Sequence, residues 1–284
     1  MATFFNQATL SYSGGTVNSN ITSGEILEVL SVNKTAVSDG YIQGSDIPYV
    51  VNIINSGNIA YTGLTVSDDL GAYEFGTPAT VVQPLEYVDG SLRYFVNGVL
   101  QATPEVTAGP PLAISDITVP ANSVVTIVYT ARANEFAPPT GEGIVNTVTV
   151  SGGGITPIEA TATIDAETEP NLSITKSVSP TTVTENGRVT YTFVIQNFGN
   201  TEAVATDNVV VTDVFNPILE DLTVTYNGAV WTSPESYTYN EATGLFRTAI
   251  GAITVPAATY TQDPATGAFI TNPGTITITV TGTI

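Results

Sequence analysis

Two stretches with the same spacing decide the fold of this chain: Tyr49-Val-Val-Asn-Ile-Ile-Asn-Ser-Gly-Asn58 and Tyr191-Thr-Phe-Val-Ile-Gln-Asn-Phe-Gly-Asn200. In each, every second residue from the tyrosine is aromatic or β-branched until an Asn-x-Gly-Asn turn, which is the pattern of a β-strand with one buried face. Further strand-like segments follow both stretches, including Asn146-Thr-Val-Thr-Val150, and no long helical period occurs. The chain is therefore expected to be all-β.

The segments around these stretches recur in the same order, so the chain contains an internal repeat. Lys34 and Lys176 precede them, Ser67-Asp68 and Thr212-Asp213 follow them, and the later runs Ile117-Thr-Val-Pro120 and Ile253-Thr-Val-Pro256 also match. Short strands separated by Asn-Gly, Gly-Asn and Pro turns are typical of an immunoglobulin-like sandwich. We expect two such domains in tandem, at residues 29–168 and 169–284, preceded by a hairpin at residues 1–28.

The repeat is offset from the ends of the sequence. The first unit closes with a hairpin that begins at Ile144-Val-Asn-Thr-Val-Thr-Val150, and the second unit has no copy of that hairpin. Its counterpart stands at the other end, because Phe4-Phe-Asn-Gln-Ala-Thr-Leu10 matches the same pattern. We therefore expect the second domain to be incomplete and to be completed by the N-terminal hairpin of another copy, which produces a head-to-tail homopolymer. Self-closure or a swapped dimer is the alternative.

The composition limits the possible functions. The formal charge is −20, from 26 acidic and 6 basic residues, and this argues against nucleic acid or an anionic membrane as a partner. The absence of Cys and His excludes disulfides, thiolate or imidazole metal ligands and Ser-His-Asp catalysis. No cofactor motif is present, so we expect no cofactor, no metal site and no turnover enzyme. The sequence also has no apolar run of transmembrane length and no signal peptide at its start.

The repeated motifs carry a family resemblance. Lys176-Ser-Val-Ser-Pro180, Val189-Thr-Tyr-Thr-Phe193, Val209-Val-Val-Thr-Asp213 and Val145-Asn-Thr-Val-Thr-Val150 resemble the eleventh domain-of-unknown-function family of Gram-positive surface proteins. The chain is also similar to the appendage proteins of clostridial spores, which implies a fibre subunit on the spore surface. A looser similarity links it to the collagen-adhesin B-type domains of Gram-positive pili, which form a Lys–Asn isopeptide bond between their first and last strands.

Each completed domain would bury three polar residues on apolar strand faces. Lys34 shares a face with Leu30 and Val32, and the same alternation buries Asn146 and Asp68. Burial lowers the pKa of a lysine and raises that of an aspartate, so a neutral amine beside a protonated acid can attack an Asn carboxamide and release ammonia. The first domain is thus expected to carry an internal Lys34–Asn146 isopeptide bond assisted by Asp68.

In the second domain the same chemistry needs another copy of the chain. Lys176 would bond to Asn6 of a neighbouring subunit, assisted by Asp213. Glu86 and Glu220 are the runner-up acids. A buried Lys–Asp ion pair without a covalent bond also explains the burial. A surface adhesin built of tandem immunoglobulin-like domains without polymerisation is the alternative function.

Overall fold

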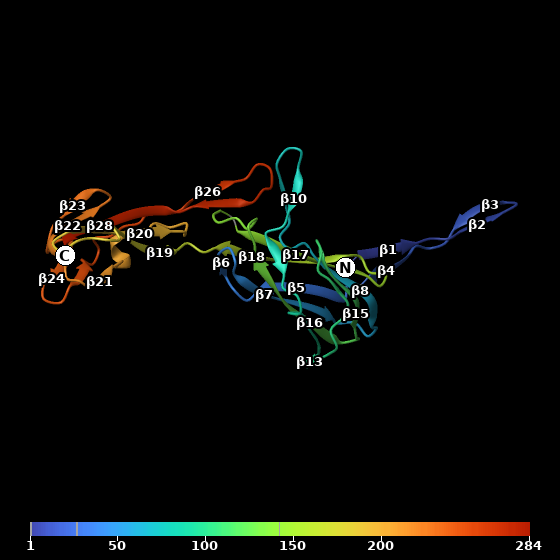
Figure 1. Cartoon of the computed structure of the whole chain (residues 1–284). Coiled ribbons are helices and arrows are strands. Elements are labelled where there is room, and N and C mark those ends of the chain that lie inside the picture. The colour runs from blue at the N-terminus through green and yellow to red at the C-terminus, as the bar shows by residue number, and fades with distance from the viewer. Residues whose placement is uncertain (1, 27, 142) are drawn as a thin grey trace.

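The computed structural model describes residues 2–26, 28–141 and 143–284, and these residues form two β-sandwiches and one separate hairpin (Figure 1). The described part of the chain contains strands and one 3-10 turn, η1 (Ala205–Asp207), and no α-helix. The fold class is therefore all-β with tandem sandwich domains, as the sequence predicts.

The first sandwich packs one six-stranded sheet on another. The first sheet has the order β13-β12-β16-β7-β5, with β11 also paired to β16: β13 (Val99–Leu100), β12 (Arg93–Val96), β16 (Ser123–Ala133), β7 (Asp46–Asn55), β5 (Leu30–Ala36) and β11 (Leu85–Tyr87). The second has the order β14-β15-β8-β17-β18-β6: β14 (Val106–Thr107), β15 (Leu112–Val119), β8 (Tyr61–Asp68), β17 (Ile144–Gly152), β18 (Ile158–Ala166) and β6 (Gly40–Tyr41). A small hairpin of β9 (Tyr73–Phe75) and β10 (Thr80–Val82) projects from it.

The alternation seen in the sequence places the core of the first sandwich. In β7, Ile47, Tyr49, Val51 and Ile53 are all fully buried, while the residues between them are partly exposed. The inward residues of β16, β8 and β17 close the other sides of the same hydrophobic cluster. The burial of every second residue on both sheets is what a two-layer sandwich requires.

The second sandwich has the same first sheet but a reduced second sheet. The first sheet has the order β19-β20-β28-β22-β23: β19 (Leu172–Ser179), β20 (Arg188–Asn197), β28 (Gly274–Thr283), β22 (Glu220–Tyr226) and β23 (Ala229–Trp231). The second has only β21 (Thr212–Val214), β25 (Leu245–Thr248) and β24 (Tyr237–Asn240). Among residues 143–284, no strand of this sandwich takes the places that β17 and β18 hold in the first.

The turns follow the predicted chemistry. Asn97 and Gly98 join β12 to β13 with φ of 50° and 77°, and Asn227 and Gly228 join β22 to β23 with φ of 47° and 82°. Left-handed φ at both positions defines a type I′ turn, which Asn-Gly favours. The two units therefore make the same hairpin at the same place.

A further hairpin links the two sandwiches. Strands β26 (Thr259–Gln262) and β27 (Phe269–Asn272) pair with each other and extend from the second sandwich toward the first (Figure 1). The Phe269 N–H donates to the Glu135 carbonyl at 2.8 Å, and Gln262 Nε2 donates to the Tyr73 hydroxyl at 3.2 Å.

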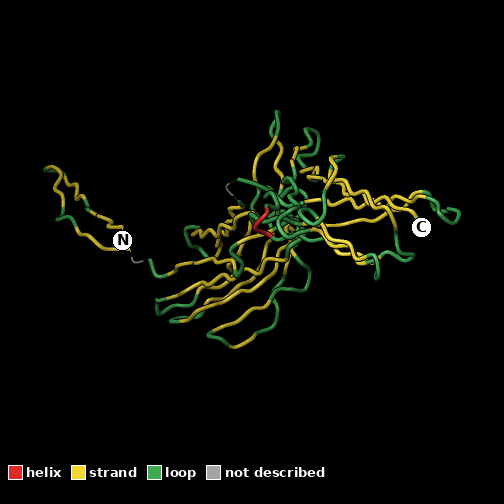
Figure 2. The backbone as a smooth tube through the Cα atoms, turned by 90° about the vertical axis from the view of Figure 1, so that its left-hand side faces the viewer, coloured by secondary structure: helices red, strands yellow, loops and turns green. Residues whose placement is uncertain are grey.

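The N-terminal hairpin lies apart from both sandwiches. Strand β1 (Ala2–Asn6) pairs with β4 (Thr22–Ile26), and β2 (Thr9–Tyr12) pairs with β3 (Gly15–Asn18). The hairpin and the second sandwich lie at opposite ends of the molecule, with the first sandwich between them (Figures 1 and 2).

Candidate functional site

Lys34 lies in the core of the first sandwich. It stands on β5, with its side chain directed between the two sheets and 0% exposed. Its Nζ donates to Asp68 Oδ2 at 2.7 Å, and the Asp68 side chain is 1% exposed. Because β5 belongs to one sheet and β8 to the other, this ion pair crosses the interior of the sandwich.

The Asp68 carboxylate has partners on both oxygens. Oδ2 accepts hydrogen bonds from Lys34 and from the Tyr129 hydroxyl, and Oδ1 accepts the Leu70 N–H at 3.0 Å. A buried carboxylate needs such donors, since burial without them costs several kcal/mol.

Asn146 lies beside Asp68 on the same sheet. It is 0% exposed on β17, and Val148, two residues further along the same face, pairs directly with Asp68. Neither Nδ2 nor Oδ1 of Asn146 has a hydrogen-bond partner among the described residues, and the Tyr49 hydroxyl is also without one. Each such group costs about 1–3 kcal/mol when buried. The Asn146 side-chain amide, which has no hydrogen-bond partner among the described residues and lies beside the buried Lys34–Asp68 ion pair, is therefore a candidate reactive group.

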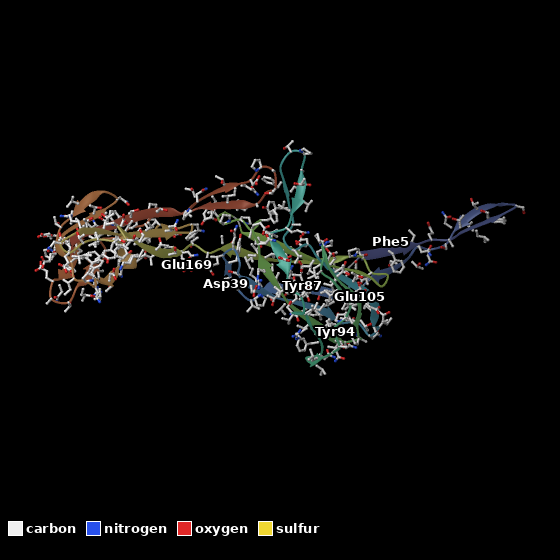
Figure 3. All side chains as sticks on the ribbon, viewed as in Figure 1. Phe5, Asp39, Tyr87, Tyr94, Glu105 and Glu169 are labelled. Atoms are coloured by element: carbon white, nitrogen blue, oxygen red, sulfur yellow. The ribbon has the colours of Figure 1, made fainter. Side chains whose placement is uncertain are left out.

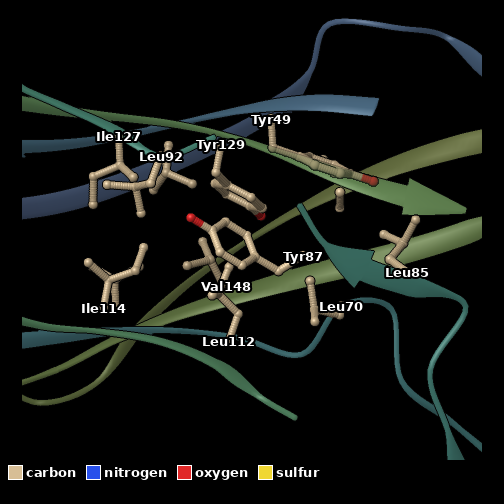
Figure 4. Close-up of a cluster of buried hydrophobic side chains, with 14 of the residues drawn as sticks. Tyr49, Leu70, Leu85, Tyr87, Leu92, Leu112, Ile114, Ile127, Tyr129 and Val148 are labelled. Atoms are coloured by element: carbon tan, nitrogen blue, oxygen red, sulfur yellow. The ribbon is translucent and has the colours of Figure 1, made fainter. Parts of the chain in front are cut away.

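Two tyrosines that the sequence pattern does not single out, Tyr49 and Tyr129, complete this cluster. Tyr49 and Tyr129 pair directly across β7 and β16, and their rings stack with centroids 5.6 Å apart (Figure 4). Lys34 Nζ lies 5.0 Å from the centre of the Tyr49 ring. The sequence could have identified both tyrosines by their positions on the inward faces of β7 and β16, because a buried tyrosine hydroxyl needs a polar partner.

Burial favours the neutral forms of Lys34, Tyr49 and Tyr129. Burial lowers the pKa of Lys34 below its usual value of 10.5, and the neighbouring Asp68 carboxylate offsets only part of that change. Burial raises the pKa of Tyr129 well above its usual range, and Asp68 adds to the rise. The Asn146 side chain acts to lower the pKa of both Tyr129 and Tyr49, against the larger effect of burial. The strand pairing links Asn146 to the tyrosines through Asp68, because Val148 on the same face of β17 pairs with Asp68, which accepts the Tyr129 hydroxyl.

The equivalent pair in the second sandwich is open to solvent. Lys176 Nζ donates to Asp213 Oδ2, but the two side chains are 40% and 19% exposed. Lys176 holds the register position of Lys34, since it pairs with Phe193 on β20 as Lys34 pairs with Val51 on β7. The difference between the two lysines therefore does not come from their own strands.

The missing strands explain this exposure. In the first sandwich β18 packs over β5, and β17 pairs with β8. In the second, every residue of β19 is exposed, including the apolar Leu172, Ile174 and Val178. β21, which carries Asp213, pairs only with β25 among the described strands and forms the edge of its sheet.

One predicted strand is shortened for the same reason. The segment Asn208–Asp213, which repeats the β8 pattern, is in a strand only at Thr212 and Asp213. In the first sandwich β8 has a hydrogen-bonded neighbour on each side. Without the neighbour that corresponds to β17, the ladder does not extend over the first part of this segment.

Asn6 is exposed on the separate hairpin. It pairs with Thr22 on β4, and Asn146 pairs with Ala162 on β18, so each asparagine stands 16 positions before its cross-strand partner. The hairpin exposes apolar side chains along its length: Phe4, Phe5, Leu10, Tyr12, Val17 and Ile21. Phe5, which is 69% exposed, projects into open space in Figure 3.

The hairpin is less regular than β17 and β18. Gln7 and Ala8 interrupt the strand between β1 and β2, and the pairing shifts by one residue there. Ser19 bridges the interruption by accepting the Ala8 N–H on its hydroxyl at 2.9 Å. On one uninterrupted strand Asn6 and Leu10 would share a face, and the interruption separates them in this structure.

The runner-up acids are not part of either cluster. Glu86 is exposed on β11, between the buried Leu85 and Tyr87, and Glu220 is exposed at the start of β22. Among the residues that the structure describes, no group of three or more Asp, Glu, His or Cys side chains is arranged to hold a metal ion. None of the described helices is long and apolar enough to cross a membrane.

No family model matches the chain, and no curated protein is similar to it in sequence. Among solved structures, the pilus backbone protein RrgB of Streptococcus pneumoniae is 12% identical with a TM-score of 0.33, over 86% of this chain and 56% of that protein. The T6 backbone pilin of Streptococcus pyogenes is 13% identical with a TM-score of 0.38, over 90% and 64%.

A third structure is a subdomain of a surface protein. The collagen-binding subdomain of the Enterococcus faecalis surface protein ACE is 5% identical with a TM-score of 0.30, over 49% of this chain and 99% of that subdomain. The match to the pneumococcal pilus protein covers about half the length of that protein.

Proposed function

We propose that this chain is the subunit of a surface fibre that polymerises head to tail by donor-strand complementation. One observation carries the proposal. Among the described residues, the second sandwich has no strands that correspond to β17 and β18, and residues 2–26 form a separate hairpin with the sequence pattern and asparagine position of those strands. The fibre would stand on a cell or spore surface, as the family resemblance implies.

The proposed occupant of the open face is the hairpin of a second copy. The apolar residues of β19 and of the hairpin are both exposed, so insertion would bury both sets. The hairpin of the same copy lies at the far end of the molecule (Figure 1). Because the hairpin and the open face are different surfaces, each added copy leaves one of each free, and the assembly propagates.

The placement of a lysine, an aspartate and an asparagine on inward faces supports an isopeptide bond in each sandwich. In the first, the Lys34 amine attacks Asn146 Cγ, the C–Nδ2 bond breaks and ammonia leaves, with Asp68 transferring the protons. In the second, Lys176 would react in the same way with Asn6 of the inserted hairpin, assisted by Asp213. Each bond forms once per site without turnover.

Deletion of residues 2–26 tests the polymerisation. The full chain should form fibres visible by negative-stain electron microscopy, and the deleted chain should remain monomeric with the first sandwich folded. Fibres that persist after the deletion would show that the hairpin is not the donor. A chain that is monomeric both with and without residues 2–26 would instead fit the surface-adhesin alternative.

The source of the completing strands needs its own control. Full chains that carry Asn6→Ala, mixed with full chains that carry Lys176→Met, should give crosslinked dimers but no longer ladder on a denaturing gel. In such a mixture the Asn6→Ala chain keeps Lys176 and the Lys176→Met chain keeps Asn6. These two residues are then the only pair that can react between subunits. The absence of dimers in the mixture would overturn the intermolecular bond.

A further inference from the structure

The first sandwich holds three buried polar atoms that its ion pair does not use. They are Asn146 Oδ1, Asn146 Nδ2 and the Tyr49 hydroxyl, and none of them has a hydrogen-bond partner among the described residues. Native proteins leave few buried polar atoms unpaired, so each of the three calls for an explanation. The Tyr129 hydroxyl belongs to the same cluster, since its ring stacks on that of Tyr49 and its hydroxyl donates to Asp68.

We propose that the hydroxyls of Tyr49 and Tyr129 form the oxyanion site for the Asn146 carbonyl during isopeptide formation. This inference rests on the proposed crosslink and names two catalytic groups that neither the repeat nor the ion pair identifies. Attack on an amide puts negative charge on its oxygen, and fixed hydroxyl donors in a dry site stabilise that charge.

The proton transfers balance without any added reactant. The Lys34 ammonium gives one proton to the Asp68 carboxylate, and the neutral amine adds to Asn146 Cγ. Asp68 then passes its proton to Nδ2 and takes one from Nζ, the C–Nδ2 bond breaks, and ammonia leaves. The products are a secondary amide, ammonia and a protonated Asp68, and both tyrosines keep their protons.

Protonation of Asp68 provides a reason for Tyr129 to change partner. Asp68 Oδ2 accepts from both Lys34 and Tyr129 while it is a carboxylate. Once that carboxyl is neutral it is a weaker acceptor, whereas Asn146 Oδ1 becomes a stronger one as the amine adds. Burial raises the pKa of Tyr49 and of Tyr129, so both remain hydroxyl donors.

The second sandwich retains only one of these hydroxyls. Tyr191 pairs with Val280 at the position where Tyr49 pairs with Tyr129 in the first sandwich. The bond between subunits would therefore form with one tyrosine donor, and it is expected to form more slowly than the bond inside the first sandwich.

Tyr49→Phe is the sharpest test. The Tyr49 hydroxyl has no partner in the unreacted cluster, so its removal breaks no hydrogen bond and keeps the stacked ring. A purely structural role predicts an unchanged rate and an equal or greater stability. An oxyanion role predicts a rate loss of about 10²-fold.

The rate is measured during refolding. Full chain carrying Asn6→Ala, which prevents the bond between subunits, is refolded from denaturant and quenched in acid at intervals. Intact mass then counts the chains that have lost about 17 Da, the mass of ammonia. Tyr49→Phe and Tyr129→Phe should each slow this loss. Tyr87→Phe is the control, because Tyr87 belongs to the same aromatic cluster and its ring centroid lies 6.4 Å from that of Tyr129.

The outcomes separate the two proposals. If the parent chain loses ammonia and Tyr49→Phe does so at the same rate, the oxyanion site is wrong and the crosslink stands. If the parent chain never loses ammonia, the crosslink itself is wrong. Unfolding midpoints of the same variants in an Asn146→Ala background, where no bond can form, show whether a slow rate comes from lost stability.

Discussion

Lys34 and Lys176 hold the same register position in two copies of one sheet, yet the first side chain is 0% exposed and the second is 40% exposed. The first is covered by β17 and β18, and the second has no covering strands among the described residues. The two lysines therefore show one site in a closed and an open form within the same chain.

Replacement of Lys34 by Met should abolish the internal bond and destabilise the first sandwich. In an Asn6→Ala background, which prevents the bond between subunits, the chain is expected to be lighter than its sequence mass by about 17 Da, and the same chain with Lys34→Met should match its own sequence mass. The loss of the buried cation leaves Asp68 unpaired, which costs about 3–5 kcal/mol in addition to the lost bond. Asn146→Ala is the matched control, because it removes the bond and keeps the ion pair. A mass deficit that persists in both variants would place any crosslink elsewhere.

The unbonded site should make stability depend on pH in a defined direction. Because burial lowers the folded pKa of Lys34 below 10.5, the unfolded chain binds more protons as pH approaches that value, and the free energy of unfolding of Asn146→Ala rises. Above pH 10.0 the tyrosines reverse the trend, since burial raises the folded pKa of Tyr49 and the unfolded chain loses that proton first. Stability should therefore pass through an alkaline maximum.

Hydrogen exchange of the β7 and β16 amides measures that stability for the first sandwich alone. The double variant Lys34→Met, Asn146→Ala should lose the rise and keep the fall. A stability that declines steadily from neutral pH in Asn146→Ala would contradict the lowered pKa of Lys34.

Loss of the intermolecular bond should leave fibres that dissolve. Asn6→Ala and Lys176→Met are each expected to assemble, because the apolar contacts of the inserted hairpin remain, but to run as monomers after boiling in detergent. Wild-type fibres should give a ladder of covalent multimers. Asn20→Ala, another exposed asparagine of the same hairpin, should behave as wild type. A ladder that survives Asn6→Ala would exclude Asn6 as the partner.

A charge placed on the open face should prevent assembly. Ile174 is 53% exposed on β19, where the inserted hairpin would cover it. Ile174→Asp would place a carboxylate in that buried contact at a cost of several kcal/mol, so fibres should be absent by electron microscopy. Val230→Asp is the control, because Val230 is 70% exposed on β23, at the opposite edge of the same sheet. Equal assembly of the two variants would move the docking surface away from β19.

The sequence predicts the fold and the polar core residues because both depend on local alternation. The period-2 pattern around Tyr49 places the inward face of β7 correctly, and the same period puts Lys34, Asp68 and Asn146 inside the first sandwich. The repeat also indicates that the second unit lacks its closing strands. These features require only which face of a strand a residue occupies.

The remaining features depend on contacts between strands that are distant in sequence. Tyr129 acts on Asp68 from 61 positions away, and the alternation does not reveal which buried hydroxyl reaches which carboxylate. The short β21 depends on an absent neighbour rather than on its own residues. Glu86 follows a leucine in the sequence, but the alternation on β11 turns it to solvent.

The positions of the four crosslinking residues have a mechanical consequence. Lys34 lies on the first strand of its sandwich and Asn146 on the second-to-last, next to the chain that continues to Lys176. With both bonds formed, a pulling force would run from Asn6 to Lys34, across to Asn146, along to Lys176 and into Asn6 of the next copy. Residues 35–145 and 177–284 would lie outside that path, while β17, β18 and the inserted hairpin would carry the load. Tension on the fibre would therefore bypass most strands of each sandwich and act on the closing strands, which hold the inward residues Val148, Val150 and Ile164.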